Sequence, residues 1–453
     1  MTRTVESTST RPHIRPLLAL AIIAACLISS LVWIQEPLLQ RALIVAGICL
    51  TLWLTEVVPP YVPTLVLWAL TPLLLLGLGD QFRLTTVLGW SANPVLALFL
   101  GGFALSVAAS RYGIDRLIAH LAVRLSGGSK LLLLVLTMAA TAALSMWMSN
   151  IAAAAMMIAA LSPLFAEVSK SDHFRRALLM GIALGANFGG MATPIGTGPN
   201  AIAIAAISST RVITFTGWMI FALPLTLGLL LVGLLLLMWR FRVRGPINNL
   251  QETRVRAPNF RARLVMLVFF LTVAAWLTEP FHRVPSAIVA LITTAVLFGS
   301  GLLQSKDLSR IDWSTLLLIA GGIGLGNLLE QSGVVRAAAA SMPWQDVPHV
   351  ARIFTLCLAS ALFSALMSNT ASVTMLIPLA AGIDPAPSTA ILIAIAASLG
   401  IPFSISTPPN AMVYGEGGVT FSDLAVPGIV LLILGCILVS LTGPFVLKLV
   451  GIP

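Results

Sequence analysis

Apolar residues follow one another along this chain in long runs that short polar stretches interrupt. The runs recur from residue 16 to residue 449, and most contain 18 or more mainly apolar residues. Such a run can cross the roughly 30 Å hydrocarbon core of a bilayer as an α-helix. About eleven membrane helices are predicted, with boundaries soft by several residues, at 16–34, 39–58, 61–79, 92–110, 175–208, 214–239, 264–282, 284–302, 313–330, 389–413 and 425–449.

Two further apolar stretches, 131–165 and 353–380, have a different pattern. Each contains a Ser-Asn pair near its centre and a proline near its end, Pro163 and Pro378. Each stretch is either one long kinked helix or a helical hairpin that enters and leaves the membrane on the same side. The hydrophobic pattern alone leaves both alternatives open.

The distribution of positive charge favours the hairpins. With two hairpins and a cytoplasmic N-terminus, eleven crossings place the C-terminus outside, and most of the 26 arginines and lysines then lie in the cytoplasm. The positive-inside rule requires this bias. If 131–165 crossed the membrane, the basic cluster at 240–263 would move outside. The segment 111–130, with basic and apolar residues at helical spacing, is predicted as an amphipathic helix on the cytoplasmic surface.

Composition supports the membrane interpretation and excludes one class of partner. The 453 residues are 58% hydrophobic and only 9% charged, and the mean hydropathy is +1.00. A soluble protein of this size needs far more polar surface. Residues 1–453 are therefore predicted as one all-α polytopic domain of the cell inner (plasma) membrane. The net charge of +10 comes from short loops rather than one folded face, which argues against binding of nucleic acid.

The chain also contains an internal repeat. The paired landmarks are WLTE at 53–56 and 276–279, Trp-Ser at 90–91 and 313–314, Gly-Gly at 101–102 and 321–322, Ser-Asn at 149–150 and 368–369, and TGPNA at 197–201 with TPPNA at 407–411. They fall in the same order and define repeats at 39–208 and 262–420. The second repeat begins five crossings after the first, and an odd number inverts it. Inverted repeats with broken helices near the midplane are typical of secondary transporters.

The paired motifs resemble those of one transporter family. Ser-Asn signatures on two opposed hairpins, each followed by a Thr-x-Pro-Asn break, are similar to those of the divalent anion/sodium symporters, the dicarboxylate, citrate and sulfate carriers. The stretches WLTEVVPPYVPT at 53–64 and NPVLALFLGGFAL at 93–105 share the resemblance, which covers essentially the whole chain. It implies a homodimer in which a transport domain moves like an elevator against a scaffold. It also implies Na⁺-coupled symport of a divalent anion, with Na⁺ as coupling ion and no cofactor.

The resemblance further implies where the ligands bind. The first Na⁺ site comprises Ser145, Ser149, Asn150 and Gly196. The second Na⁺ site comprises Ser364, the carbonyl of Met367, Asn369 and Ser406. The substrate site comprises Asn150, Ile151, Thr197, Asn369, Thr370, Thr407 and Pro408.

One of these positions departs from the family pattern. The first signature reads Ser-Asn-Ile where the family has Ser-Asn-Thr, and Ile151 lacks the hydroxyl that faces the anion in the family. Its counterpart, Thr370, retains the hydroxyl. A C4 dicarboxylate is the first expected substrate, and sulfate or a sulfonate is the next.

The motif regions contain no arginine or lysine, although a buried dianion loses much hydration energy. Positive potential must then come from helix N-termini, from backbone N–H groups freed at the breaks and from bound Na⁺. Asparagine suits such a site because its amide oxygen can coordinate Na⁺ while its NH₂ group donates to a carboxylate. We therefore expect Na⁺ and anion binding to be coupled.

Other functions fit the sequence less well. A Na⁺-independent anion exchanger is the main alternative, and it would need a fixed positive residue near the site. An intramembrane enzyme would need a nucleophile–base pair or metal ligands at membrane depth, and neither histidine nor GxSxG occurs there. A channel is disfavoured because discontinuous repeats suit alternating access. Glu56 and Glu279 are possible proton carriers, but their places at helix ends beside proline favour capped or solvated carboxylates.

Overall fold

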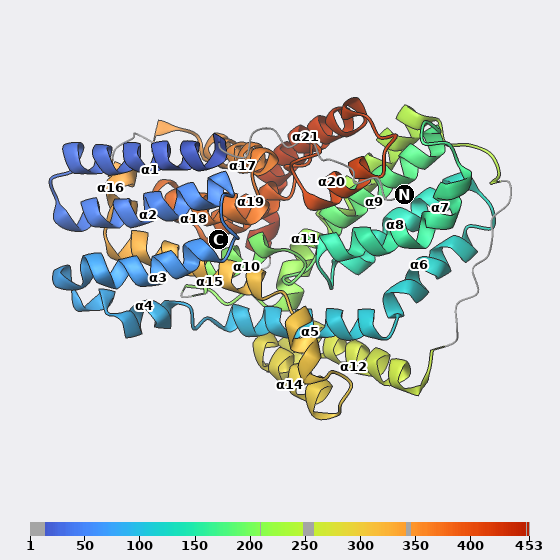
Figure 1. Ribbon diagram of the computed structural model, residues 1–453, viewed down its shortest axis with the longest axis horizontal. Helices are drawn as coiled ribbons and strands as arrows, with labels where there is room; N and C mark the ends of the chain where they lie inside the picture. Colours follow the sequence, from blue (N-terminus) through green and yellow to red (C-terminus); the bar gives the residue numbers. More distant parts are fainter. Residues whose placement is uncertain (1–13, 209, 248–257, 341–345, 450, 453) are drawn as a thin grey trace, which may run out of the picture.

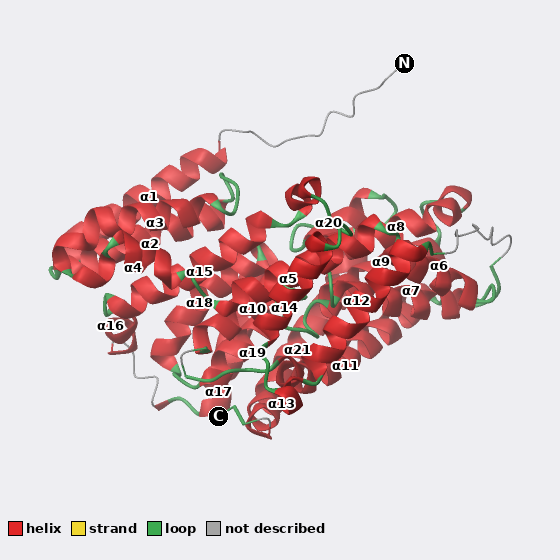
Figure 2. Cartoon of the chain, turned by 90° about the horizontal axis from the view of Figure 1, so that it is seen from below, coloured by secondary structure: helices red, strands yellow, loops and turns green. Residues whose placement is uncertain are grey.

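The computed structural model describes residues 14–208, 210–247, 258–340, 346–449 and 451–452. Every regular element in these ranges is a helix, and Figure 2 shows helices joined by loops with no strand in the part drawn in colour. The prediction of an all-α protein is therefore confirmed.

The helices of the first half begin at residue 14. They are α1 (Ile14–Trp33), α2 (Pro37–Thr55), α3 (Val62–Leu75), α4 (Leu84–Trp90), α5 (Pro94–Arg111), α6 (Ile114–Leu125), α7 (Lys130–Ser145), α8 (Asn150–Glu167), α9 (His173–Gly189), α10 (Gly198–Ile207) and α11 (Phe215–Phe241), with short 3₁₀ turns η1 (Leu76–Leu78) and η2 (Asp80–Phe82).

The second half runs from residue 260. Its helices are α12 (Phe260–Leu277), α13 (Glu279–His282), α14 (Ser286–Gly299), α15 (Trp313–Gln331), α16 (Val334–Ala340), α17 (His349–Leu366), α18 (Asn369–Ile383), α19 (Pro387–Ala397), α20 (Pro408–Gly415) and α21 (Phe421–Leu449), with the 3₁₀ helix η3 (Ser305–Arg310).

Local sequence signals set many helix starts. Asn93 accepts a hydrogen bond from the amide of Val95, and Pro94 occupies the first position of α5. Asp172 and Thr214 cap α9 and α11 in the same way. A polar side chain before the first turn satisfies amides that have no partner inside the helix, and proline there loses no hydrogen bond. The predicted boundaries therefore lie within a few residues of those observed.

Helix length and hydropathy identify part of the predicted set of about eleven membrane helices. Within the described chain, nine helices are long and apolar enough to cross a membrane. The predicted helices 61–79 and 284–302 are shorter, because α3 passes into a 3₁₀ turn and α14 ends at the Gly299–Gly301 turn. The hairpin arms α8 and α17 are among the nine. Helices α4, η3 and α16 were not predicted, because they are too short for a hydrophobic window to detect.

Both Ser-Asn stretches fold back as hairpins. A continuous helix from residue 349 to residue 384 would span about 50 Å at about 1.5 Å per residue. Instead, His349 Nε2 lies 3.3 Å from Asp384 Oδ2, and Arg352 lies 3.7 Å from the same carboxylate. The second stretch thus returns to its starting point, and the hairpin alternative is correct.

The first stretch returns in the same manner. Lys130, at the start of α7, lies 5.5 Å from the ring of Phe174, and Arg175 lies 5.3 Å from the ring of Phe165 near the end of α8. The two ends of this hairpin therefore meet beside the start of α9. Helix α6 lies within the segment 111–130 predicted to be helical and packs against α7 and α8.

The predicted helices 175–208 and 389–413 are each broken, as the glycines and prolines within them indicated. The first consists of α9 and α10 with a loop at 190–197, and the second of α19 and α20 with a loop at 398–407. Most residues of these loops are buried, although Ile405 in the second loop is exposed.

The helices form an elongated body in which the two halves interlock. Figure 1 shows α1–α4 and α16 at one end and α6–α9 at the other, with α10, α15 and α19 between them. Helix α5 of the first half packs along α14 of the second, and α15 packs along α3. A Cβ atom on Gly101 would lie 2.7 Å from the Cα of Ala290, and so the α5–α14 contact needs glycine at this position.

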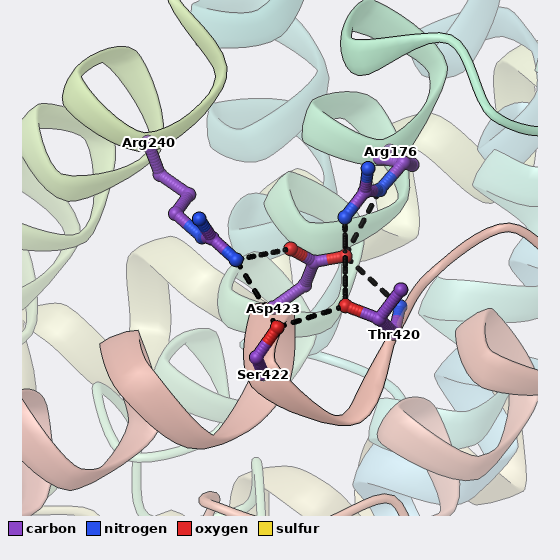
Figure 3. Close-up of polar contacts among 5 residues, drawn as sticks. All are labelled: Arg176, Arg240, Thr420, Ser422 and Asp423. Atoms are coloured by element: carbon purple, nitrogen blue, oxygen red, sulfur yellow. Dashed lines mark hydrogen bonds and ion pairs between the residues drawn. The ribbon is translucent and has the colours of Figure 1, made fainter.

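A buried ion cluster joins three helices at one end of the body. The carboxylate of Asp423, at the start of α21, contacts Arg176 of α9 and lies 3.2 Å from Arg240 of α11. Figure 3 shows both guanidinium groups turned toward it, with Thr420 donating its backbone amide to the same carboxylate at 2.9 Å. The start of α9, the end of α11 and the start of α21 therefore lie together.

The second hairpin can be tested by crosslinking. In a variant whose four native cysteines are replaced by alanine, the pair His349→Cys and Asp384→Cys should form a disulfide on oxidation, because only a hairpin brings these two positions within side-chain reach of one another. The measurement is loss of labelling by a maleimide-polyethylene glycol reagent. A pair at His349 and Leu366, the two ends of α17, is the control and should remain labelled. Full labelling of the 349/384 pair after oxidation would show that the stretch does not fold back.

Candidate functional site

The candidate site is built around two matched groups of oxygen atoms. In the first, Oγ of Ser145 lies 2.7 Å from Oδ1 of Asn150 and 2.6 Å from the carbonyl oxygen of Ala186. We call these three residues the first node. In the second node, Oγ of Ser364 lies 2.6 Å from Oδ1 of Asn369 and 2.6 Å from the carbonyl oxygen of Ala397. Both predicted Ser/Asn pairs are therefore brought together.

Each node joins the same three elements. The serine lies at or near the end of the first hairpin arm, and the asparagine is the first residue of the second arm. The carbonyl comes from the end of the helix that precedes a broken loop, α9 or α19. Both serines are fully buried. The sequence motifs that recur at the hairpins and at the broken helices therefore produce the same arrangement of atoms twice.

The serines before the asparagines both cap helices, Ser149 of the predicted first Na⁺ site and Ser368, for which no role was predicted. Ser149 accepts a hydrogen bond from the amide of Ala152 at 3.3 Å, and Ser368 accepts one from Ala371 at 3.1 Å. Both are N-caps, which fix the start of α8 and α18. Their caps place Asn150 and Asn369 at helix N-termini, where the backbone dipoles favour negative charge.

Two asparagines hold the broken loops, Asn200 and Asn410, and in the sequence they stood out only as parts of the internal repeat. Asn200 donates through Nδ2 to the carbonyls of Gly190, at 3.1 Å, and Thr193, at 2.8 Å. Asn410 donates in the same way to Ile401, at 2.8 Å, and Phe403, at 3.0 Å. Their recurrence in TGPNA and TPPNA was the signal that could have revealed this role.

A further bond links the two halves. Asn187 donates through Nδ2 to Oδ1 of Asn410 at 2.9 Å, and both side chains are buried. Asn187 follows Ala186, whose carbonyl belongs to the first node, whereas Asn410 holds the second loop. No repeat indicated this contact, because Ser398 follows Ala397 at the matching place.

Gly196, predicted in the first Na⁺ site, lies in the loop that passes the first node. A Cβ atom on Gly190 would lie 2.6 Å from Oδ1 of Asn150 and 3.1 Å from the carbonyl oxygen of Gly196. The loop therefore passes directly against the asparagine, and only glycine at residue 190 permits this approach.

The remaining predicted residues of the second Na⁺ site are placed less uniformly. Met367 lies between the hairpin arms with an extended backbone, φ −139° and ψ −177°, and is buried. Ser406 bonds within its own loop, donating to the carbonyl of Phe403 at 2.7 Å and accepting from its amide at 2.8 Å. Gly400 brings this loop against the node, since a Cβ atom there would lie 2.7 Å from Cβ of Ser364.

The predicted substrate residues divide between two helix pairs. Thr370 contacts the start of α10, where a Cβ atom on Gly198 would lie 2.6 Å from its Oγ1, next to Thr197. In the other pair, α20, which begins at Pro408, packs against α8. Thr407 caps α20 by accepting from the amide of Asn410 at 3.3 Å. Ile151, on the first turn of α8, is 49% exposed.

Two cavities open beside the capping serines. The first, of about 580 Å³, is lined by Phe103, Ser106, Val107, Ser110, Arg111, Arg116, Ser149, Ala152, Met156, Arg310 and Asp312. We call it the basic cavity. The second, of about 480 Å³, is lined by Leu52, Trp53, Glu56, Val57, Val58, Pro59, Pro60, Leu318 and Ser368. We call it the Glu56 cavity.

The two matched glutamates are used differently. Glu279 is buried and accepts hydrogen bonds from the amide of Phe215, at 3.1 Å, and from both the amide and the hydroxyl of Ser286. It is a capped carboxylate, as expected. Glu56 directly follows the last residue of α2, has a left-handed backbone with φ +50°, and lines the Glu56 cavity.

Comparison with known proteins gives the family. The family model described as "Citrate transporter" (CitMHS) matches residues 10–400. An uncharacterized transporter of Haemophilus influenzae is 31% identical over 434 residues, which cover 90% of this chain and 91% of that protein. A sodium-dependent dicarboxylate transporter, SdcS of Staphylococcus saprophyticus, is 26% identical, covering 87% of this chain and 83% of that protein.

Two further likenesses extend this result. The inorganic phosphate transporter PHO87 of Saccharomyces cerevisiae is 28% identical over 402 residues, covering 83% of this chain but 43% of that longer protein. The YdaH transporter of Alcanivorax borkumensis has a similar fold, with a TM-score of 0.58 at 16% identity, covering 87% of this chain and 98% of that one. The protein is therefore a multi-pass membrane transporter and not an enzyme, and the chain belongs to the citrate transporter family, CitMHS.

Proposed function

We propose that this protein is a Na⁺-coupled symporter of a small divalent anion, with a C4 dicarboxylate as first candidate and sulfate or a sulfonate next. The observation that carries the proposal is the pair of matched nodes. The hydroxyl of Ser145 has one proton, but two acceptor oxygens lie within 2.7 Å of its Oγ. The same holds for Ser364.

A single proton can serve only one of the two acceptors. The serine oxygen and the second acceptor then face each other without a proton between them. Either the asparagine amide is turned so that its NH₂ group donates, or a bound cation lies between the oxygens. Each node offers only neutral oxygens from a hydroxyl, an amide and a carbonyl. Hard cations prefer such oxygen ligands, and a site without carboxylate suits a monovalent ion. The name of the SdcS relatives supports Na⁺ as that ion.

The anion would bind next to the nodes. Asn150 and Asn369 begin α8 and α18, and α8 packs on α20 as α18 packs on α10. Helix N-termini attract anions through free amides and backbone dipoles. The segments that form these pairs contain no arginine or lysine, so bound Na⁺ would supply the full positive charge. Anion binding would then require Na⁺, which is the basis of symport.

The fold suggests how the site would be carried across the membrane. The matched hydrogen bonds of the two nodes and two loops support the repeats at 39–208 and 262–420 as structural units. We propose that they are inverted, that the hairpins are re-entrant from opposite sides, and that the site moves by an elevator mechanism in a homodimer. The N-terminus would be cytoplasmic and the C-terminus outside.

A Na⁺-independent anion exchanger of the same fold is the alternative. It would hold the anion with a fixed positive residue, whereas residues 131–165 and 353–380 contain none. Uptake that requires Na⁺ supports the symporter, and uptake that needs only a counter-anion supports the exchanger.

Replacing the node serines should weaken Na⁺ binding. Ser364→Ala removes one oxygen of the second node, and we expect the KM for Na⁺ in anion uptake to rise about 5- to 30-fold, which corresponds to about 1–2 kcal/mol for a lost polar contact. Ser145→Ala should act similarly. The matched control is Ser360→Ala, one turn earlier on α17, because this buried serine also donates to a carbonyl of α19, Ile393 at 2.8 Å, but lies outside the node.

The control separates ion binding from stability. Both variants on α17 lose one buried hydrogen bond to α19, so their unfolding temperatures should fall by similar amounts. If Ser360→Ala raises the KM for Na⁺ as much as Ser364→Ala does, the nodes do not bind the ion.

Substrate preference should depend on Ile151. Ile151→Thr restores a hydroxyl on a half-exposed side chain and should shift preference toward C4 dicarboxylates by about 5-fold or more, the value of one hydrogen bond to a charged group. Thr370→Val should reduce uptake of every substrate. Valine is chosen because it keeps the shape of threonine against Gly198, where a larger residue would collide. Competition between succinate and sulfate in both variants measures the ranking, and an unchanged ranking in Ile151→Thr would mean that residue 151 does not face the anion.

The membrane orientation can be tested with exposed loop residues. A cysteine at Arg244 should react only with reagents added to the cytoplasmic side, and one at Pro385 only with reagents added outside. Both positions are exposed, so an absent signal reflects sidedness rather than burial. Reaction of both from one side would contradict the inverted arrangement.

A further inference from the structure

The two cavities beside the capping serines differ in charge. Three arginines line the basic cavity, together with the carboxylate of Asp312. Aliphatic, aromatic and proline side chains surround the Glu56 cavity, and Glu56 is the one charged residue among those that line it. The two cavities therefore differ in what they offer an anion, because only the basic cavity has guanidinium groups in its wall.

The residues that line the basic cavity follow the length of α5. Phe103, Ser106, Val107 and Ser110 lie on one face of α5, at intervals of three and four residues, and cover about 10 Å of its length. Arg111 follows at the end of that helix, and Ser149 lies at the turn of the first hairpin. The cavity thus runs along α5 from a basic end toward the start of α8, past two serine hydroxyls.

At the basic end, Arg111 and Arg310 share one carboxylate partner, Asp307. Arg111 forms an ion pair with Asp307, whose side chain is only 2% exposed, and Arg310 lies 3.8 Å from the same carboxylate. Asp307 itself does not line the cavity. Asp312 is occupied in capping α15, where it accepts from the amide and hydroxyl of Thr315 at 3.0 and 2.6 Å. Three guanidinium groups and one carboxylate thus line the cavity, and Asp307 lies behind two of the three arginines.

We propose that the basic cavity is a second anion-binding site, which holds a small dianion before it reaches, or after it leaves, the site at the nodes. This inference rests on the proposed function. The volume of about 580 Å³ accommodates a dicarboxylate or sulfate with its remaining water. Arginine presents a planar set of donors that matches carboxylate and sulfate oxygens, and Ser106 and Ser110 add hydroxyl donors along the wall.

Binding in this cavity makes transport asymmetric. The basic cavity raises the local anion concentration on its own side of the membrane, which the charge distribution predicts to be the cytoplasmic side. The anion therefore has a lower KM when it is offered from that side than when it is offered from the opposite side of the membrane.

The first experiment compares transport in the two directions. Uptake of succinate and of sulfate is measured in right-side-out and inside-out membrane vesicles. Arg310→Gln should raise the KM about 3- to 10-fold for anion offered on the side of the basic cavity, with kcat in that direction unchanged. Because the transport equilibrium links kcat/KM in the two directions, the opposite direction should keep its KM and lose the same factor in kcat. Arg310→Lys keeps the positive charge, so its KM on that side should stay close to the wild-type value. The control is Arg83→Gln, because Arg83 is also 62% exposed and also pairs with an aspartate three residues away, but lies far along the chain from the cavity.

The outcomes separate this proposal from the function on which it rests. Failure of the wild-type protein to transport either dianion contradicts the symporter, whatever Arg310→Gln does. Equal KM changes on both sides, or none, contradict the second site while leaving the symporter intact. An effect that disappears in vesicles without anionic lipid shows that the occupant is a lipid phosphate, and it also overturns the proposal.

The second experiment detects binding without transport. In a cysteine-free background, Ser110→Cys places a thiol on the exposed wall of the cavity. Succinate or sulfate should slow its modification by a negatively charged thiol reagent, and addition of Arg310→Gln should abolish that protection. Modification at the same rate with and without either anion would show that the cavity binds neither.

Discussion

Backbone groups in the middle of a membrane protein must find partners without water, and in each of the two broken loops one asparagine side chain satisfies two of them. The side-chain amide of Asn200 serves two carbonyls of the first loop, and that of Asn410 serves two carbonyls of the second. Irregular backbone is tolerated at such depth only when protein groups satisfy it. Because these loops are held, α10 and α20 can begin inside the protein, and Gly190 and Gly400 can approach the nodes.

The interlocked halves position the nodes relative to one another. Helix α5 lies on α14 and α15 on α3, so each half is packed against the other rather than against itself alone. Glycine permits the closest of these contacts, as at Gly101 beside Ala290. The Asn187–Asn410 bond joins the halves again, deep inside the site. Movement of one node relative to the other would break this bond and leave buried amide groups without partners, which is costly.

Much of this arrangement could be predicted from local patterns. Apolar runs located the helices, the placement of arginines favoured the hairpins, and the repeated Ser-Asn and Pro-Asn motifs indicated the nodes. The long-range contacts could not be predicted in this way. Asn187 contacts Asn410, and residues of α5 share a cavity with Arg310 and Asp312, although these partners lie about 200 residues apart in the sequence. A local rule also accounts for the cap that Ser149 forms, since serine is favoured directly before the first turn of a helix.

The Asn187–Asn410 bond occurs once, although its surroundings occur twice. At the matching place in the other half, Ser398 is buried, and its hydroxyl has no hydrogen-bond partner among the described residues. The same contrast separates Ile151 from Thr370. A protein with two copies of a binding element can keep the shared framework in both while each copy accumulates its own substitutions. Selectivity can then change in one copy without loss of the fold that the two maintain together.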